Sequence, residues 1–252
     1  MTSLLIPEGI LILTALLTVF VGVLGDQKWQ RKIVIVPILG LSLAFLGSIL
    51  ATRPEASDVL SKTLILDSVS QFLKVIFILV ALAVIVIGHL SREIEQQYKN
   101  EFYSLIILAT LASCIIASAV HLLTLYMAYE MASLIFCLLC AFKRESSLTS
   151  EASMKLLVIG VATSLFFLLG LVLFFGLTQS LNILDIRAFI EKSQPSNLYL
   201  IVALGLIFVA IATRMSLFPF HLAGPDFIDG ASVPTAAYLA VGPFLIGVVL
   251  AL

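Results

Sequence analysis

Long apolar runs, separated by short polar segments, repeat along all 252 residues of the chain. A helix that crosses a membrane needs roughly 20 consecutive, mostly apolar residues. Eight segments meet this requirement: 4–24, 33–52, 68–90, 102–119, 121–142, 154–178, 198–221 and 232–252. The pattern therefore predicts an all-α integral membrane protein with about eight transmembrane helices, folded as a single transmembrane domain over residues 1–252.

The seventh predicted span contains residues that interrupt a helix, in the stretch "ATRMSLFPFHLAGPDFIDG". Pro219 removes a backbone donor, and Gly224 with Pro225 is expected to end the helix. Broken helices at membrane depth are tolerated only where they face protein or water, and they recur in transporters. Before this span, residues 181–192 ("LNILDIRAFIEK") predict a short amphipathic helix that lies flat at the membrane interface.

The composition agrees with a membrane protein, because 61% of the residues are apolar and 12% are charged. Soluble domains carry roughly 45–50% apolar and about 25% charged residues. The net charge of −1 gives no electrostatic basis for binding nucleic acid. Cys114, Cys137 and Cys140 lie in apolar runs, without the second cysteine pair or histidine cluster that a metal site requires. We expect them to pack as small buried residues, and we predict no metal site.

The distribution of lysine and arginine predicts the orientation of the helices. Eight basic residues fall on one predicted side and four on the other; the first set is Lys28, Arg31, Lys32, Arg92, Lys99, Lys143, Arg144 and Lys155, and the second is Arg53, Lys62, Arg187 and Lys192. The first set is expected in the cytoplasm, which places the N-terminus on the non-cytoplasmic side. The sequence shows no cleavable targeting segment, which favours a bacterial inner membrane, with the thylakoid or mitochondrial inner membrane as alternatives.

Three charged residues lie within the predicted spans. Lys74 is close to one end of the third span, so its side chain is expected to reach the interface. Glu130 is in the middle of the fifth span, and Arg214 is sixteen residues into the seventh. A lone charge at that depth costs about 2.5–3.5 kcal/mol on insertion scales. Glu130 and Arg214 are therefore expected to be partners, either as a structural ion pair or as part of a proton relay or ion path.

The two members of this pair have different chemistry. A glutamate can take up and release a proton, whereas an arginine keeps its charge under ordinary conditions. If protons pass here, Glu130 is expected to carry them, and Arg214 to set the electric field around it. His221, at the predicted break, suits a proton shuttle; it equally suits hydrogen bonding to backbone carbonyls freed by the break.

Several motifs resemble those of a known family. The block "PFHLAGPDFIDGASVPTAAYLAVGP" is similar to the signature P-F-H-x-W-x-P-D-x-Y-x-G-A-P-x-P of the antiporter-like membrane subunits of respiratory complex I (NADH:quinone oxidoreductase). "LTLYMAYEMASLIFCLLCAFKRE", "SEASMKLLVIGVATSLFFLLG" and "LILDSVSQFLKVIFIL" are similar to three further segments of that family, in the same order. The nearest branch resembles subunit N, which corresponds to mitochondrial subunit 2 and to its counterpart in the photosynthetic relative of the complex.

The resemblance implies a fold and roles for single residues. The family fold is a bundle with two inverted repeats of five helices; here 1–100 would be accessory helices and 101–252 the first repeat, with the second missing or incomplete. Glu130 would pair with the cation on the broken helix, at Arg214. Lys155 would bias the glutamate from the cytoplasmic side, and His221 would lie on the proton pathway.

The implied function is that of a non-redox, proton-translocating membrane-arm subunit in a complex I-like NAD(P)H or ferredoxin:quinone oxidoreductase. This chain is expected to hold no cofactor; NAD(P)H, FMN, iron–sulfur clusters and quinone are expected in partner subunits. Lipids and the other membrane subunits of the assembly are the expected partners.

The sequence also departs from the family pattern. Phe244 stands where relatives place a second lysine, Arg214 replaces the first, and Ala223 is near the place of the signature tryptophan. The last apolar run stops at Leu252 without a polar tail, so we expect the polypeptide to continue or a partner chain to supply the second repeat. Two alternative functions remain: a non-pumping structural subunit derived from such a pump, and a cation/proton antiporter-type subunit.

Overall fold

The computed structural model describes residues 6–24, 34–50, 57–59, 63–143, 146–192 and 198–251. Within these ranges the chain is almost entirely helical. The helices are α1 (Ile6–Leu24), α3 (Ile35–Leu50), α4 (Ser68–Leu90), α5 (Lys99–Ser118), α6 (Leu122–Cys140), α7 (Ser147–Thr178), α8 (Ile183–Lys192), α9 (Leu198–Arg214), α10 (Ala223–Gly230) and α11 (Val233–Ala251). Two short 3-10 helices, η2 (Gln96–Tyr98) and η3 (Phe220–Leu222), precede α5 and α10.

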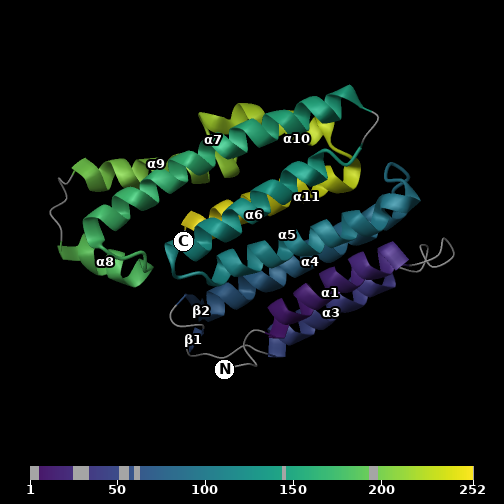
Figure 1. Cartoon of the computed structure of the whole chain (residues 1–252), viewed down its shortest axis with the longest axis horizontal. Helices are drawn as coiled ribbons and strands as arrows, with labels where there is room; N and C mark the ends of the chain where they lie inside the picture. Colours follow the sequence, from purple (N-terminus) through teal and green to yellow (C-terminus); the bar gives the residue numbers. More distant parts are fainter. Residues whose placement is uncertain are drawn as a thin grey trace.

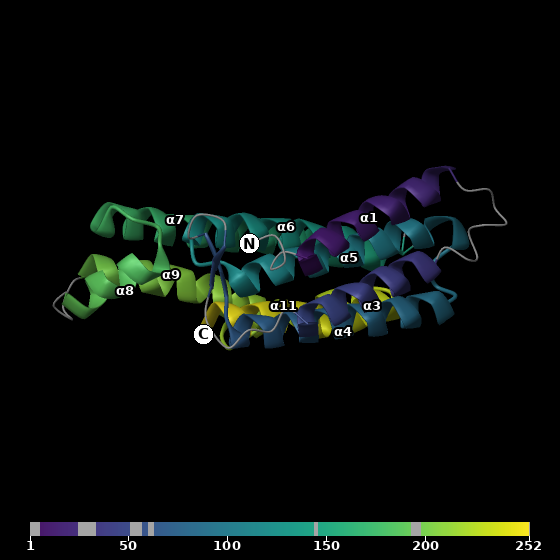
Figure 2. The same ribbon diagram turned by 90° about the horizontal axis from the view of Figure 1, so that it is seen from below.

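The long helices form two layers (Figures 1 and 2). Helices α7, α6, α5 and α1 lie side by side in one layer, and α9, α11, α4 and α3 lie in the other. Facing helices pack in pairs across the layers: α7 on α9, α6 on α11, α5 on α4 and α1 on α3. The molecule therefore contains two neighbouring groups of four helices, the α1/α3/α4/α5 quartet and the α6/α7/α9/α11 quartet.

The predicted apolar segments match the observed helices. Among the described residues, α4, α5 with η2, α6, α7 and α11 are long and apolar enough to cross a membrane, and α1, α3 and α9 are shorter apolar helices. The chain is an integral membrane protein, and eight complete spans remain a prediction. The short helix expected over 181–192 is present as α8, and it lies between α7 and α9 (Figure 1).

One element was not expected. Strands β1 (Ser57–Val59) and β2 (Leu64–Leu66) form an antiparallel pair before α4, so the chain is not purely helical. Leu64 also forms a bridge with Ala119, which joins β2 to the end of α5. Asp67 then caps α4, because its side chain accepts a hydrogen bond from the Ser70 amide at 2.8 Å. Strands of three residues are too short to give a visible alternation of apolar and polar positions.

The break in the seventh segment is confirmed, but its position differs from the prediction. Helix α9 ends at Arg214, before Pro219, and a turn leads into η3 and α10. Gly224 and Pro225, expected to stop the helix, instead lie in the first turn of α10. Proline is tolerated there because the first amides of a helix have no intrahelical partner.

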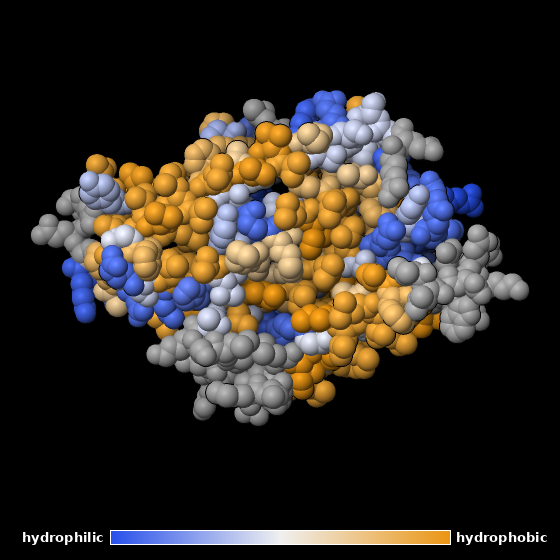
Figure 3. Space-filling model, in the orientation of Figure 1, coloured by the Kyte–Doolittle hydropathy of each residue, from blue (hydrophilic) through white to orange (hydrophobic). Residues whose placement is uncertain are grey.

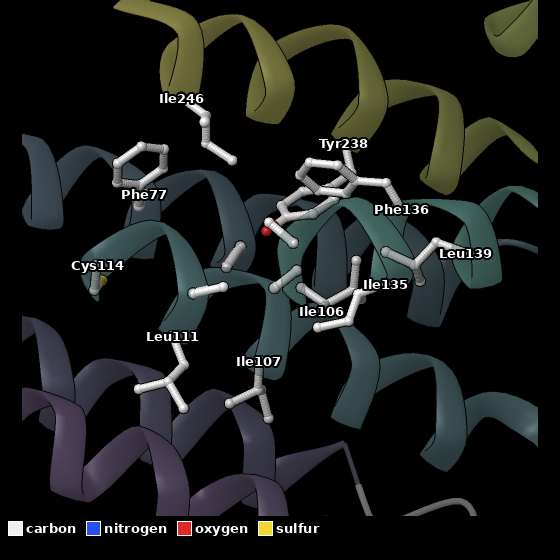
Figure 4. Close-up of a cluster of buried hydrophobic side chains, with 14 of the residues drawn as sticks. Phe77, Ile106, Ile107, Leu111, Cys114, Ile135, Phe136, Leu139, Tyr238 and Ile246 are labelled. Carbon is white, nitrogen blue, oxygen red and sulfur yellow. The ribbon is translucent and has the colours of Figure 1, made fainter. Parts of the chain in front are cut away.

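An apolar core connects the two quartets. Figure 4 shows side chains from α4, α5, α6 and α11 meeting in this core, with Phe136 next to Tyr238. The two rings pack edge to face with centroids 5.8 Å apart. A second connection is polar: the Val233 amide at the start of α11 donates to Glu93 Oε2 at 2.7 Å, in the segment after α4. The face seen in Figure 3 is largely apolar, as expected for contact with lipid.

Lys74 does not reach the interface, contrary to the prediction. Its side chain is buried, with an exposed fraction of 1%, and Nζ donates to Glu8 Oε1 at 2.5 Å. The prediction failed because it considered only the position of Lys74 along α4. The position of Glu8 opposite it depends on how the helices pack.

Candidate proton-transfer site

Arg214 lies beside a cavity of about 440 Å³ in the α6/α7/α9/α11 quartet. The residue is the last of α9, so the break directly follows it. The cavity is lined mainly by apolar side chains, together with Thr163, Thr213, Ser216 and Asp229. Figure 3 shows a hollow with hydrophilic atoms on this face of the molecule, surrounded by apolar surface. An ionised side chain at membrane depth needs such a polar or hydrated opening.

Aromatic rings hold the guanidinium group in place. Its Cζ atom lies 4.4 Å from the centroid of the Tyr129 ring and 5.7 Å from that of Phe136. Cation–π contacts of this kind contribute about 0.5–2 kcal/mol, depending on solvation. They do not satisfy the N–H donors, and Nε and Nη2 are buried without a hydrogen-bond partner. The site therefore fixes the position of Arg214 while leaving hydrogen-bonding capacity unused.

Glu130 lies on α6, directly after Tyr129. Ser164 of α7 interacts with its carboxyl group, and the charge of Arg214 is close enough to act on it. No ion pair of 4.0 Å or less joins Glu130 to Arg214, although the structure describes both residues. Glu130 Oε1 is buried without a hydrogen-bond partner. The two charges are thus neighbours that do not touch.

Lys155 contacts two carboxylates, one on α7 and one on α10. Its Nζ atom lies 2.8 Å from Glu151 Oε1 and 3.0 Å from Asp226 Oδ2, and its side chain is 44% exposed. A smaller cavity of about 200 Å³ lies beside this cluster, on the face between α7 and α10. Asp229 of α10 lines both this cavity and the one at Arg214. Lys155 therefore joins α7 to α10 through its ion pair with Asp226. The cavity beside Lys155 and the cavity at Arg214 share Asp229 as a lining residue.

His221 and Phe244 lie at the edges of the site. His221 belongs to η3 at the break, and its ring stacks on Phe218 with centroids 5.7 Å apart. His221 is exposed and does not line the Arg214 cavity. Phe244 lines that cavity from α11 and is 46% exposed. The structure thus places an apolar ring in the cavity wall at the position where the resemblance implies a lysine.

Several neighbours of Glu130 were not predicted from the sequence. Tyr126 lies one turn before Glu130 on the same helix, and its hydroxyl group interacts with both Glu130 and Ser164. Ser164 follows Thr163 in an otherwise apolar stretch of α7, and these two adjacent hydroxyl groups were the available signal. Asp229 lies in the interrupted stretch of the seventh segment, but nothing in its spacing showed that it lines two cavities.

The site combines three helices: a broken helix that carries a cation, a long helix packed on it, and a third helix that carries a carboxylate near the cation. This combination is that of the class of antiporter-like membrane subunits. The comparison with protein families agrees. The chain belongs to the NADH:quinone oxidoreductase/Mrp antiporter transmembrane family, whose model matches residues 118–252, more than half of the chain.

Known proteins with similar sequences extend this assignment. NADH-quinone oxidoreductase subunit N 2 of Koribacter versatilis is 28% identical over 95% of this chain and 50% of its own length. F(420)H(2) dehydrogenase subunit N of Methanosarcina mazei is 31% identical over 98% of this chain and 51% of its own length. The resemblance to subunit N is confirmed. The chain spans about half the length of these relatives.

Solved structures show the same fold. A chain of respiratory complex I from Thermus thermophilus superimposes with a TM-score of 0.81 at 26% identity, over 98% of this chain and 52% of that one. A chain of the Mrp complex from Dietzia sp. has a TM-score of 0.77 at 20% identity, over 99% of this chain and 27% of that one. The second similarity concerns the fold alone.

Proposed function

We propose that this chain is a proton-translocating membrane-arm subunit of a complex I-like NAD(P)H or ferredoxin:quinone oxidoreductase. The observation that carries the proposal is the placement of Glu130 and Arg214 on diagonally opposed helices of one quartet. Both carry buried polar atoms without protein partners, and Arg214 and Tyr129, the residue before Glu130, line a cavity at the helix break. A dry structural ion pair needs direct contact and satisfied hydrogen bonds to offset the cost of burial.

In this proposal Glu130 takes up and releases the proton. Water supplies the missing partners of Arg214 Nε and Nη2 from the cavity, and of Glu130 Oε1 beside it, because buried polar groups are normally hydrogen-bonded to protein or ordered water. Arg214 stays charged and stabilises the ionised form of Glu130. Asp229 lines both this cavity and the one beside Lys155, and His221 lies on η3 at the break.

The assembly around the chain is part of the same proposal. Residues 101–252 would form the first antiporter-like repeat and 1–100 the accessory helices, with further polypeptide or a partner chain supplying the second repeat. NAD(P)H, FMN, iron–sulfur clusters and quinone would be held by partner subunits. The energy released by electron transfer in those subunits would reach this chain only through a conformational change or a change in the electric field.

The test is Glu130→Gln in the native membrane assembly. We expect the assembly to form and proton pumping to fall by roughly tenfold or more, equivalent to at least about 1.4 kcal/mol. Electron transfer falls with it if the two are tightly coupled. Pumping is measured in vesicles with a pH-sensitive dye, and assembly by native gel. Unchanged pumping in a fully assembled variant rules the proposal out.

A second candidate, a non-pumping structural subunit, is favoured by one observation: the phenyl ring of Phe244 occupies the cavity wall. A ring cannot carry or bias a proton. In that case Glu130→Gln damages assembly, because it leaves the Arg214 charge unbalanced in a low-dielectric interior. Loss of assembly, with residual assembled complexes that pump normally, supports this second function.

A further inference from the structure

A second buried acid–base couple lies in the other quartet. Glu8 is the third residue of α1, and Lys74 is the seventh of α4. Helices α1 and α4 are diagonal to each other in the α1/α3/α4/α5 quartet, with α3 and α5 completing it. The Glu8–Lys74 ion pair therefore crosses the centre of the quartet.

This couple is incompletely satisfied. Glu8, Gln71 and Lys74 have exposed fractions of only 7%, 3% and 1%. Glu8 Oε2 and both polar atoms of the Gln71 side chain have no hydrogen-bond partner. Gln71 lies three residues before Lys74 on α4, so both side chains are on one face of the helix. A buried carboxylate oxygen and a buried amide without partners destabilise the fold, unless water satisfies them.

The arrangement repeats that of the proposed site. In each quartet a carboxylate lies on a helix of one layer (Glu8 on α1, Glu130 on α6), and a cation lies on the diagonal helix of the other layer (Lys74 on α4, Arg214 on α9). The two couples differ in contact, since Glu8 and Lys74 form a direct ion pair and Glu130 and Arg214 do not, and they differ in the cation. A lysine ammonium group can give up its proton when buried, and arginine does not.

We propose that Glu8, Gln71 and Lys74 form a hydrated proton-exchange site, separate from Glu130. The site binds water molecules. Glu8 Oε2, the Gln71 amide and the remaining N–H groups of Lys74 hold them. In the exchange step an N–H bond of the ammonium group breaks and an O–H bond forms on Glu8, which converts the ion pair into a neutral amine and a neutral acid. The reverse step restores the pair. Bound water exchanges protons with solvent by giving a proton to the neutral amine, which leaves protonated Glu8 beside the ammonium group, or by taking one from the neutral acid, which leaves the carboxylate beside the neutral amine.

Few other titratable groups face this couple. Cys114 of α5 is buried and interacts electrostatically with both Glu8 and Lys74. Helix α3 carries no titratable side chain, and Glu8 is the only such residue in α1. On α4 the other titratable residue, His89, is at the opposite end of the helix. Glu8, as a carboxylate, and Lys74, as a neutral amine, are therefore the main groups that accept the proton.

The experiment uses infrared difference spectroscopy on the native membrane assembly, recorded between acidic and alkaline buffers in H₂O and in D₂O. We expect a protonated-carboxyl band that shifts in D₂O, is lost in Glu8→Gln and is retained in Glu130→Gln. Retention of the complete carboxyl signal in Glu8→Gln overturns the proposal. Because the two glutamates are assigned separately, failure here leaves the Glu130 proposal standing, and the reverse also holds.

Two further variants keep the test decisive if Glu8→Gln does not assemble. The double variant Glu8→Gln with Lys74→Met removes both charges together, and we expect it to assemble and to lack the band. Gln71→Leu keeps the ion pair and removes the amide that binds water, so we expect the band to shift. An unshifted band in Gln71→Leu shows a dry structural pair and overturns the hydrated site.

Discussion

At the scale of single residues, the central feature is a fixed cation that touches rings and no carboxylate. Arg214 is held over Tyr129 at 4.4 Å, while Glu130 lies beyond ion-pair distance. A direct ion pair with arginine, which does not release its proton, would hold Glu130 firmly in its ionised form. Separation by more than a contact distance leaves the charge of Arg214 effective on Glu130, since charges interact over several ångströms in a low-dielectric interior. The glutamate can then still change its protonation state.

Substitutions of Arg214 test this division of roles. Arg214→Lys keeps the charge, so we expect pumping to stay within about threefold of the native rate, because a factor of three is well under 1.4 kcal/mol. Arg214→Gln removes the charge, and we expect a loss of roughly tenfold or more. The dye assay in vesicles measures both. Equal rates for the two variants would contradict a role for the charge.

The wall of the cavity gives a second prediction at this scale. Phe244→Lys introduces a cation into the cavity that Arg214 already lines. Like charges repel, so we expect lower thermal stability of the assembly, by about 1 kcal/mol or more at an effective dielectric constant near that of a protein surface. Phe244→Leu is the control, because it keeps the wall apolar. A lysine variant as stable as the leucine variant would show that the cavity holds an anion or ample water.

At the scale of elements, the broken segment depends on close packing of α10 against α7. A Cβ atom on Gly230 would lie 2.3 Å from the Cβ atom of Ala152 and 2.9 Å from the carbonyl oxygen of Leu148. Thr149 adds a hydrogen bond to the Gly230 carbonyl oxygen at 2.7 Å. Only a residue without a side chain allows this approach, and Lys155 with Asp226 secures the same pair of helices at the rim.

Gly230→Ala is therefore expected to push α10 away from α7 and to destabilise the assembly by about 1–3 kcal/mol, the typical cost of overpacking. Gly205→Ala in α9 is the matched control, because its added Cβ atom would meet nothing within 4 Å. Thermal melting of the purified assembly compares the two. Equal melting midpoints would show that α10 is not packed on α7 in the assembly.

The elements themselves were predictable, and their contacts were not. The ends of α4 and α6 lie within two residues of the apolar runs at 68–90 and 121–142, because composition alone decides which segments lie in lipid. The break, and the nearness of Glu130 to Arg214, were also predicted from the sequence. The Lys74–Glu8 and Lys155–Asp226 pairs were not, since each joins residues at least 66 positions apart and depends on how helices rotate about their axes.

At the scale of the whole molecule, two quartets share one two-layered body and one apolar core (Figures 2 and 4). Each quartet holds one diagonal acid–base couple. The couples lie in separate quartets, and the core between them is formed by rings such as Phe136 and Tyr238. Any communication between them must therefore pass through packing or the electric field rather than through a continuous hydrogen-bonded chain of described side chains.

The orientation of this body in the membrane is a testable prediction. A single cysteine introduced at Lys143 is expected to react from the cytoplasmic side, and one at Lys192 from the opposite side, because basic residues favour the cytoplasm. Labelling of inverted and right-side-out vesicles with an impermeant maleimide distinguishes the two. The protein without an introduced cysteine is the control for Cys137. Reaction of both positions from one side would refute the predicted orientation.

The hydrogen bond from the Val233 amide to Glu93 has a mechanical consequence. Glu93 belongs to the segment that links α4 to α5, whereas Val233 opens α11, so this 2.7 Å contact is a tether between the two halves of the body. Helix α11 cannot slide along its axis without stretching the tether or dragging the linking segment with it. A movement of α11 along its axis that begins at the broken segment would thus be passed on to α4 and α5 as a pull on the segment that links them.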